Sequence, residues 1–358
     1  MAGQAAENVT IQDLIDTLTQ HGDHSRKFEK QLSSYVDKHL EVRDLKELED
    51  LMNHTEPDHR YLGFYGMFIC HRRLMQYSKL REMLDAHRNE FEHYESYAHL
   101  YTLCHIDHND RLATGDELMG HISDAENVIK TFRRLETLQN PVNLAGVLHA
   151  FADLVITYCE RYKEHQQEIL KIWGRKAEQA LAEAIDKEDY AKYYCTKGRL
   201  QALKNDYENA VDLVKEAVCR EQPGNYASIS QYSLRIMQYQ SHLVSIQARG
   251  EIHNLNEQQS RMNENVEHIR SSLLNNVEII AFFSGIISFV IGSLTLAKDS
   301  SAMQAAGLIV VLLGALLLVY NCFAMLLHME KELCLARKIV FAVGSLCIVV
   351  GGLVIAFL

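Results

Sequence analysis

Clusters of basic side chains are the residues of this chain whose type and spacing best suit ligand binding. Guanidinium groups bind phosphate oxygens in a bidentate manner, so arginines gathered on a helix favour a nucleotide or an oligonucleotide. We predict five arginines as ligand-binding residues: Arg72, Arg73, Arg81, Arg133 and Arg134. The same side chains also fit solvated helix faces.

A second pattern would suit catalysis on a phosphodiester. The segment from Arg88 to His93 is Arg-Asn-Glu-Phe-Glu-His. It resembles the motif of HEPN ribonucleases, an arginine, a polar residue, three further residues and a histidine. The resemblance implies that Arg88 and His93 of paired helices would face a scissile phosphate. A salt-bridged, solvated helix face contains the same residues. We predict that the protein is not an enzyme and retain a HEPN-like ribonuclease as an alternative.

One run of residues has the spacing of metal ligands: Cys104, His105, Asp107, His108 and Asp110. Cys104 stands at helical spacing from Leu100, which is typical of a core position, and 18 histidines make such runs common. The eight cysteines form no CxxC pair, which favours reduced, buried thiols. The sequence also lacks the motifs of phosphate-binding loops, serine hydrolases, zinc proteases and kinases. We therefore predict no metal and no cofactor.

Three long apolar runs occupy residues 279–297, 302–327 and 339–358. Each is close to the roughly 20 residues that a helix needs to cross a bilayer, and none contains a charged side chain. We predict three transmembrane helices within a membrane module at residues 277–358, with the lipid bilayer as a partner.

The basic residues beside these spans predict their orientation. Most of them fall on one side of the membrane: Arg261, Arg270, Lys331, Arg337 and Lys338. Only Lys298 falls on the other side, and short cytoplasmic loops carry the excess of Lys and Arg. The first residues also lack the pattern of an export signal. We expect a multi-pass protein of the bacterial inner membrane, with a cytoplasmic N-terminal domain and the C-terminus on the opposite side.

Small residues recur along the spans. Ser284, Ser288 and Gly292 repeat every four residues, and this spacing lets helices approach closely in lipid. Together with Asn321, they are our candidates for span packing or for lining a pore. Gly307 and Gly314, like Gly344 and Gly351, repeat every seven residues. The spans hold no ionisable side chain that would suit a proton relay or a voltage sensor.

The part of the chain before the membrane module is expected to be helical. Residues 1–225 show helical periodicity, and the chain has only three prolines, which fall between the periodic segments. A formal net charge of -11 argues against general nucleic-acid binding. The fold class that we predict is all-α.

One helix pair has a more specific pattern. The residues that carry it are Tyr194, Gly198, Asn205, Tyr207, Ala210, Val214 and Ala217, with Pro223 just past the end. They resemble one unit of the tetratricopeptide repeat (TPR), from which Lys197 and Gln201 depart. Gly198 and Ala210 would let the two helices cross closely. The resemblance implies a TPR-like helical solenoid over residues 60–223. An irregular helical bundle that contains one such pair is the alternative.

Residues 226–276 predict one long connecting helix with a coiled-coil-like seam. Apolar residues alternate by three and four from Ile229 to Ile246, and again from Ile252 to Leu273. The two registers are offset around Gly250, which predicts a phase slip or a bend. We expect this helix to pair with copies of itself in a homo-oligomer rather than to lie against the solenoid.

The complete layout resembles the membrane effectors of bacterial antiphage defence. That resemblance implies a cytoplasmic sensor that binds a nucleotide, an oligonucleotide or a partner protein. It then gates an oligomeric transmembrane assembly that permeabilises or depolarises the inner membrane, as an ion channel or pore active in abortive infection. The alternative is a membrane-anchored TPR scaffold that recruits proteins. The three spans exceed the single span that tethering requires.

Overall fold

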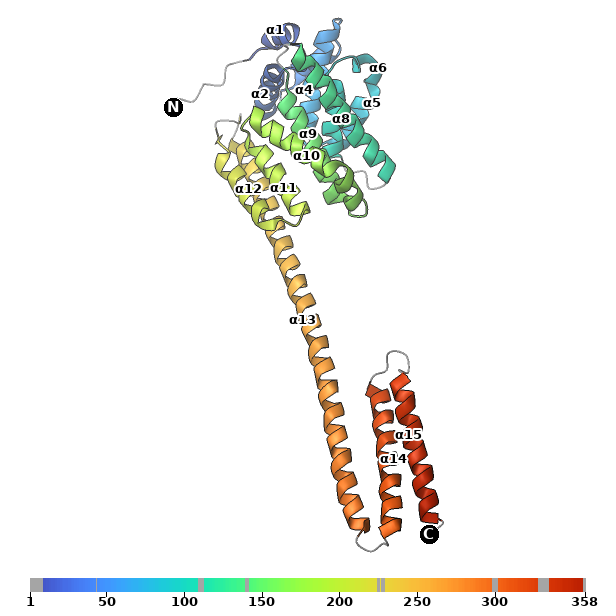
Figure 1. The fold of residues 1–358 in the computed structure, drawn as a ribbon. Helices are drawn as coiled ribbons and strands as arrows, with labels where there is room; N and C mark the ends of the chain where they lie inside the picture. The colour runs from blue at the N-terminus through green and yellow to red at the C-terminus, as the bar shows by residue number, and fades with distance from the viewer. Residues whose placement is uncertain are drawn as a thin grey trace. The chain divides into compact units, whose positions relative to one another are not determined.

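The computed structural model contains fifteen α-helices among the residues that it describes, as predicted for an all-α protein (Figure 1). The described residues are 9–42, 44–108, 113–138, 142–223, 226, 229–297, 302–327 and 335–356. The helices are α1 Ile11–His21, α2 Arg26–Val42, α3 Lys46–Met52, α4 Pro57–Arg73, α5 Tyr77–Ala86, α6 Arg88–Phe91, α7 Tyr97–Asp107, α8 Gly115–Thr137, α9 Leu144–Arg161, α10 Gln166–Lys187, α11 Ala191–Leu203, α12 Tyr207–Arg220, α13 Ile229–Ala297, α14 Ala302–Leu327 and α15 Leu335–Ala356.

The chain forms two compact units, Met1–His253 and Asn254–Leu358. We call them the helical unit and the membrane unit. The boundary lies inside α13, which continues through the predicted connecting segment and the predicted first span as one helix of 69 residues.

Local sequence signals explain where several helices begin. Thr10 with Asp13 caps α1, and Thr114 with Glu117 caps α8, each through reciprocal side-chain and backbone hydrogen bonds. Pro57 stands in the first turn of α4, where its missing N–H costs no helical hydrogen bond.

The first core of the helical unit is rich in aromatic side chains and is formed by helices α1 through α7. Tyr61 and Phe64 of α4 are fully buried in it, and the Tyr61 ring stacks on the Tyr94 ring with centroids 3.7 Å apart. The Tyr61 hydroxyl lies 2.7 Å from Ser96 Oγ, and Ser96 in turn donates to Asp23. These hydrogen bonds satisfy polar groups that would otherwise be costly to bury.

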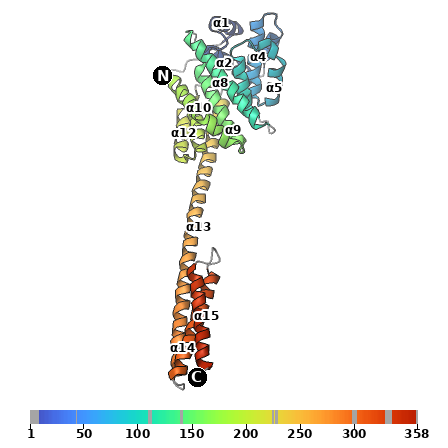
Figure 2. The same ribbon diagram turned by 45° about the vertical axis from the view of Figure 1, so that its right-hand side comes forward.

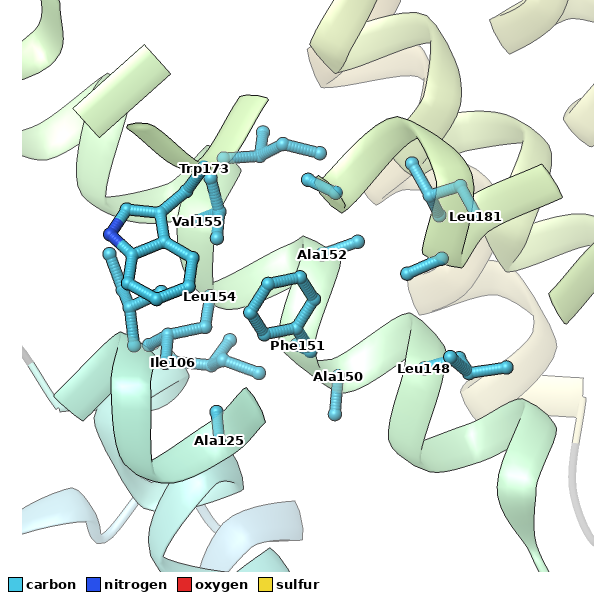
Figure 3. Packing of buried hydrophobic residues seen from close by; sticks show 14 of the residues in the cluster. Ile106, Ala125, Leu148, Ala150, Phe151, Ala152, Leu154, Val155, Trp173 and Leu181 are labelled. Atoms are coloured by element: carbon cyan, nitrogen blue, oxygen red, sulfur yellow. The ribbon is translucent and has the colours of Figure 1, made fainter. Parts of the chain in front are cut away.

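The second core surrounds α9, which is buried on every face from Leu144 to Cys159. A helix that is buried on every face lies in the middle of a fold. Figure 3 shows Phe151 of α9 in the centre of this cluster, with Trp173 and Leu181 of α10 on either side. The Phe151 and Trp173 rings meet edge to face, with centroids 6.2 Å apart.

Helices α11 and α12 form the predicted hairpin, with the expected close crossing. A Cβ atom on Gly198 would lie 2.8 Å from the carbonyl oxygen of Ala210 and 2.7 Å from Val214 Cγ2, so only glycine fits. Asn205 turns the chain between the helices with a φ of 65°, a conformation that asparagine tolerates. The two helices have 13 and 14 residues, whereas α8, α9 and α10 have 23, 18 and 22. These five helices therefore do not share a uniform repeat length.

The first turns of α13 complete the helical unit by packing on that hairpin. Tyr239 and Ile246 are buried in a third core with Ala210, Val214 and other residues of α11 and α12. Gly250 continues the contact, because an added Cβ would lie 3.1 Å from Tyr207 Cβ. We call Tyr239, Leu243, Ile246 and Gly250 the docking face. The helix is uninterrupted at Gly250, so the glycine serves a close approach between helices.

Between Gly250 and the first predicted span, one row of apolar residues of α13 is exposed. We call the second register the seam: Ile252, Leu255, Gln259, Met262, Val266, Ile269 and Leu273. Its six apolar side chains are between 55% and 64% exposed. The docking face and the seam thus belong to one helix but differ in what covers them.

Three helices of the described chain are long and apolar enough to cross a membrane, which indicates a multi-pass membrane protein. In the membrane unit, α14 and α15 lie side by side (Figures 1 and 2). A Cβ on Gly314 would lie 2.6 Å from the carbonyl oxygen of Gly344, and one on Gly351 would lie 2.7 Å from that of Gly307. The predicted glycine repeats therefore face each other, and the two backbones approach closely.

Candidate functional site at the start of the long helix

A belt of buried and half-buried polar side chains runs between α9 and α11, next to the region where α13 packs. Its members recur every three or four residues, so each set lies on one helix face. We call them the polar belt: His149, Asp153, Thr157 and Glu160 of α9 with Lys192, Thr196 and Arg199 of α11.

Arg199 is the centre of this belt. Its Nη1 donates to Asp153 Oδ1 at 2.6 Å, and its Nη2 donates to Thr157 Oγ1 at 3.0 Å. Nη2 and Nε also donate to Glu160, at 2.6 Å and 3.2 Å. Lys192 Nζ lies 3.5 Å from the second oxygen of Asp153. One arginine therefore joins α9 to α11 over nearly two turns of α9.

The charges of the belt stabilise one another. Burial alone would raise the pKa of Asp153, but Lys192 and Arg199 outweigh burial and lower it far below its usual range. Burial alone would lower the pKa of Arg199, but the carboxylates of Asp153 and Glu160 raise it above its ordinary value. Both groups are charged at neutral pH, and removing either one would leave the other buried without compensation.

Cations of several helices lie close enough to Lys192 to influence its pKa. Burial lowers the pKa of the Lys192 ammonium, Asp153 opposes that effect, and the charges of Arg235 and Arg72 lower the pKa further. Arg72 comes from the end of α4 and Arg235 from the start of α13, so cations of separate helices act on one lysine. Carboxylates pair with two of these cations, Arg72 with Asp107 and Lys192 with Asp153.

Other groups of the belt are poorly suited to nucleophilic or acid–base chemistry. Burial lowers the pKa of His149 well below its usual value, and its Nε2 lies 2.9 Å from Thr196 Oγ1. Burial also raises the pKa of the adjacent Cys195 thiol to about 12, so this thiol stays protonated. The geometry fits binding and positioning better than it fits catalysis.

Helix α13 joins this site through the docking face. The Tyr239 hydroxyl donates to Glu221 Oε2 at 2.9 Å in a buried contact just after α12. Burial lowers the pKa of His242, one turn further along α13, as does the charge of Arg199. The charge of Arg199 therefore connects the belt electrostatically to His242 of α13.

The structure places the five predicted ligand-binding arginines on three helices, α4, α5 and α8. Four of them pair with carboxylates: Arg72 with Asp107, Arg73 with Asp37, Arg81 with Asp85 and Arg133 with Glu183. Arg134 is exposed on α8. Arg72 is the member whose charge acts on Lys192 of the belt. Ligand binding by all five arginines stays a prediction.

Arg88 and His93 do not share a helix in this structure. Helix α6 ends at Phe91, before His93, and both side chains are exposed. The Arg88 guanidinium lies 5.9 Å from the centroid of the Tyr101 ring. Catalysis by Arg88 and His93, the HEPN-like alternative, stays a prediction.

The residues with metal-ligand spacing, Cys104 to Asp110, have different surroundings where the structure describes them. Cys104 is buried in the aromatic core, where burial raises its pKa to about 11, while Asp107 pairs with Arg72. Asp110 lies outside the described residues.

A different group can hold a metal ion by its geometry: His54, Glu56 and His59, whose ligand atoms lie within 4.8 Å of one another. Its His-x-Glu-x-x-His spacing was readable in the sequence. The positive N-terminal end of α4 opposes a cation there.

In the first predicted span, the row formed by Ser284, Ser288 and Gly292 is not packed against another helix of the described chain. Ser284 and Ser288 are exposed, and a Cβ on Gly292 would meet nothing within 4 Å. Instead, Gly285 lies against Leu316 of α14. Asn321 of α14 is buried. A role for these residues in packing between copies or in a pore stays a prediction.

No family model, no curated protein and no solved structure matches this chain. The polar belt is the site that sequence patterns did not find. A periodicity of polar residues inside α9, the most apolar helix of the helical unit, was the available signal.

Proposed function

We propose that this protein is a membrane effector. Its helical unit binds a ligand or partner, and α13 conveys that event to transmembrane helices that permeabilise or depolarise the membrane. In a bacterium, this activity would serve antiphage defence, because the layout resembles that of such effectors.

The observation that carries the proposal is the continuity of α13. The helix contains the docking face at one end and the first predicted span at the other, without a break from Ile229 to Ala297. Hydrogen-bonded helices resist bending, so a rotation or shift imposed at Tyr239 and Ile246 would reach Ser284 and Ser288. A flexible linker would lose such a motion, and anchoring alone would not require this helix.

The polar belt is the part of the helical unit best suited to detect an anionic ligand. Arg72, Lys192 and Arg235 come from α4, α11 and α13, and their charges act on one another. An anion held by these cations would relieve their mutual repulsion and favour one position of α13 over another. Differential affinity for two positions is what allows a ligand to act as a switch.

The open stripe of the first span supplies a surface that such a motion could regulate. Ser284, Ser288 and Gly292 lie on one helix face, and no charged group accompanies them in the span. Copies of this face around an axis would form a pore lined by hydroxyls and glycine.

Membrane potential in bacteria that express the full chain tests the proposal, with a voltage-sensitive dye and phage challenge as the trigger. We expect depolarisation by the full chain and none by a chain that ends at Asn276. Gly292→Leu should abolish depolarisation, whereas the matched change Ile287→Leu on the same span should not. A normal potential under every trigger, with the protein inserted, would reject the effector and favour a scaffold that recruits proteins.

A separate variant tests whether the polar belt senses the ligand. Lys192→Glu reverses a charge of the belt, and we expect it to prevent triggered depolarisation. Lys176→Glu is the control, because Lys176 is an exposed residue of α10 that pairs with Glu126 away from the belt. Equal behaviour of the two variants would exclude the belt as the ligand site.

A further inference from the structure

The seam of α13 is the largest apolar feature of the segment between the helical unit and the spans. Six apolar side chains stand on one face, each more than half exposed, on a helix whose other faces are polar. Exposed apolar groups in such a row mark an interaction surface. The charged residues Glu257, Arg261, Glu264, Glu267 and Arg270 exclude this segment from the hydrocarbon of a membrane.

We propose that the seam binds the seam of a second copy of this chain in a parallel, in-register coiled coil over Ile252 to Leu273. The proposal rests on the proposed function only in taking the first span to enter a membrane. It adds the partner, the direction and the register of the assembly.

The spacing of the seam fits a heptad repeat. Ile252, Gln259, Val266 and Leu273 occupy the a positions, and Leu255, Met262 and Ile269 occupy the d positions. A repeat of 3.5 residues keeps a and d side chains on the side that faces a partner helix. The seam is about three heptads long, which is short for a free coiled coil. Two chains confined to one bilayer gain a high effective concentration that offsets the short length.

The residues that flank the seam favour an identical partner. The e and g positions are almost free of charge: Glu251, Asn256, Gln258, Asn263, Asn265, Arg270 and Ser272. In a parallel pair, each g residue meets the e residue five positions later in the other helix, and no such meeting here joins like charges. A partner helix with charged e and g positions would therefore gain little electrostatic attraction from this helix.

Two ion pairs form within the helix itself. Arg261 lies 3.7 Å from Glu257, and Arg270 lies 3.8 Å from Glu267. Glu257, Arg261 and Glu267 occupy outer heptad positions, which keeps them in solvent when the seam is covered.

The membrane sets the direction and register. Copies that insert with the same topology enter the bilayer at the same residue of α13, so their seams stand parallel and at the same height. Gln259 then meets Gln259 of the second copy, because both occupy the same a layer. A polar pair at one a layer disfavours shifted registers, which would bury glutamine against apolar groups.

Cysteine crosslinking of the full chain in membranes tests the proposal. Leu255→Cys and Ile269→Cys place thiols at opposite ends of the seam, in a background that carries Cys219→Ser because Cys219 is exposed. In a parallel, in-register pair, each variant forms a disulfide-linked dimer by itself. The controls are Glu257→Cys and Ser271→Cys, two residues further along on the outer face. The chain without an added cysteine provides the baseline.

We expect several times more dimer from each seam variant than from its control. Equal crosslinking of seam and control positions would reveal random collisions and reject the seam as the interface. Crosslinks that form only when Leu255→Cys and Ile269→Cys chains are mixed would show an antiparallel pair and reject the stated register. Absence of dimer in inserted protein would reject self-association. The gel readout is independent of membrane potential, so the coiled coil and the effector activity can fail separately.

A charge on the seam provides a second measurement. Val266→Glu should reduce the size of the detergent-solubilised assembly, because it places like charges in one a layer. Glu264→Lys, on the outer face, should leave the size unchanged. Retained helicity and Trp173 fluorescence in both variants would confirm that the fold is intact.

Discussion

The docking face and the seam of α13 have the same kind of sequence and opposite surroundings. Both repeat apolar residues every three or four positions, yet Ile246 is 3% exposed and Ile252, fewer than two turns later, is 58% exposed. The difference comes from the neighbouring helices. Tyr207 of α12 meets α13 at Gly250, and the contacts of the helical unit end about there. Helical periodicity thus identifies a surface that needs a partner, but it does not identify the partner.

The comparison also explains the change of register. The docking face must match the hairpin of α11 and α12, whereas the seam has to match only another helix. Each partner selects its own line of residues along α13, so the phase offset at Gly250 marks a change of partner within an unbroken helix.

The largest expected effect is at the belt beneath the docking face. Asp153→Ala removes a carboxylate that is 4% exposed and leaves Arg199 and Lys192 undercompensated. We expect a loss of about 3–5 kcal/mol in the free energy of unfolding. Trp173 is the only tryptophan and lies in the helical unit, so its fluorescence during denaturation of the full chain reports this loss. Glu178→Ala breaks the exposed pair with Lys204 and should cost less than about 1 kcal/mol. Comparable losses would show that the belt is not a stabilising network.

The next largest effect is expected from matched substitutions on the docking face and on the seam. Ile246→Ala should weaken the docking of α13 by about 2–5 kcal/mol, because it opens a cavity in the third core. Ile252→Ala should change the stability of the helical unit by less than about 0.5 kcal/mol and act on self-association instead. Hydrogen exchange of the Tyr239–Gly250 amides measures the first effect, and assembly size measures the second. Faster exchange in Ile252→Ala would erase the distinction between the faces.

Acid should destabilise the helical unit but not the seam. Burial lowers the pKa of His99 from 6.5 to about 4. Between these values the unfolded chain binds a proton that the folded chain does not, so the free energy of unfolding falls as the pH drops from 6.5 to 4. The contribution is on the order of 3 kcal/mol, at about 1.36 kcal/mol per pKa unit. His99→Asn should reduce the pH dependence of Trp173 unfolding, whereas His93→Asn at an exposed position should retain it. An unchanged slope in His99→Asn would assign the acid sensitivity to other groups.

The smallest effect concerns the hairpin on which the docking face rests. Gly198→Ala should destabilise the helical unit by about 1–3 kcal/mol, because the new methyl group meets Val214 and the Ala210 carbonyl. Gly120→Ala, at an open position of α8, should stabilise it by about 0.5–1 kcal/mol through the lower entropy of the unfolded chain. Effects of the same sign in thermal denaturation would contradict the close crossing.

Local and periodic features of the fold were predictable from the sequence. The three apolar helices, the crossing at Gly198 and the facing glycines of α14 and α15 each follow from residue types at fixed intervals along one or two neighbouring helices. Neighbours in sequence are neighbours in space inside a helix or a hairpin, so spacing alone determines these contacts.

The candidate site was less predictable. Among the predicted arginines, Arg72 acts on the belt, while Arg73, Arg81 and Arg133 pair with carboxylates elsewhere in the helical unit. Asp153 and Arg199 are 46 residues apart in the chain, and no local pattern connects them.

By itself, the sequence determined the helical character, the apolar spans and the existence of two apolar registers on the long helix. These properties depend on intrinsic propensity, hydrophobicity and periodicity, which act over a few residues. Only the tertiary structure decided that Tyr239 and Ile246 of the first register are buried, that the second register is open, and that Asp153, Arg199 and Lys192 share one site. Burial and ion pairing depend on which distant helix lies opposite a face, and that choice is made by the packing of the whole helical unit.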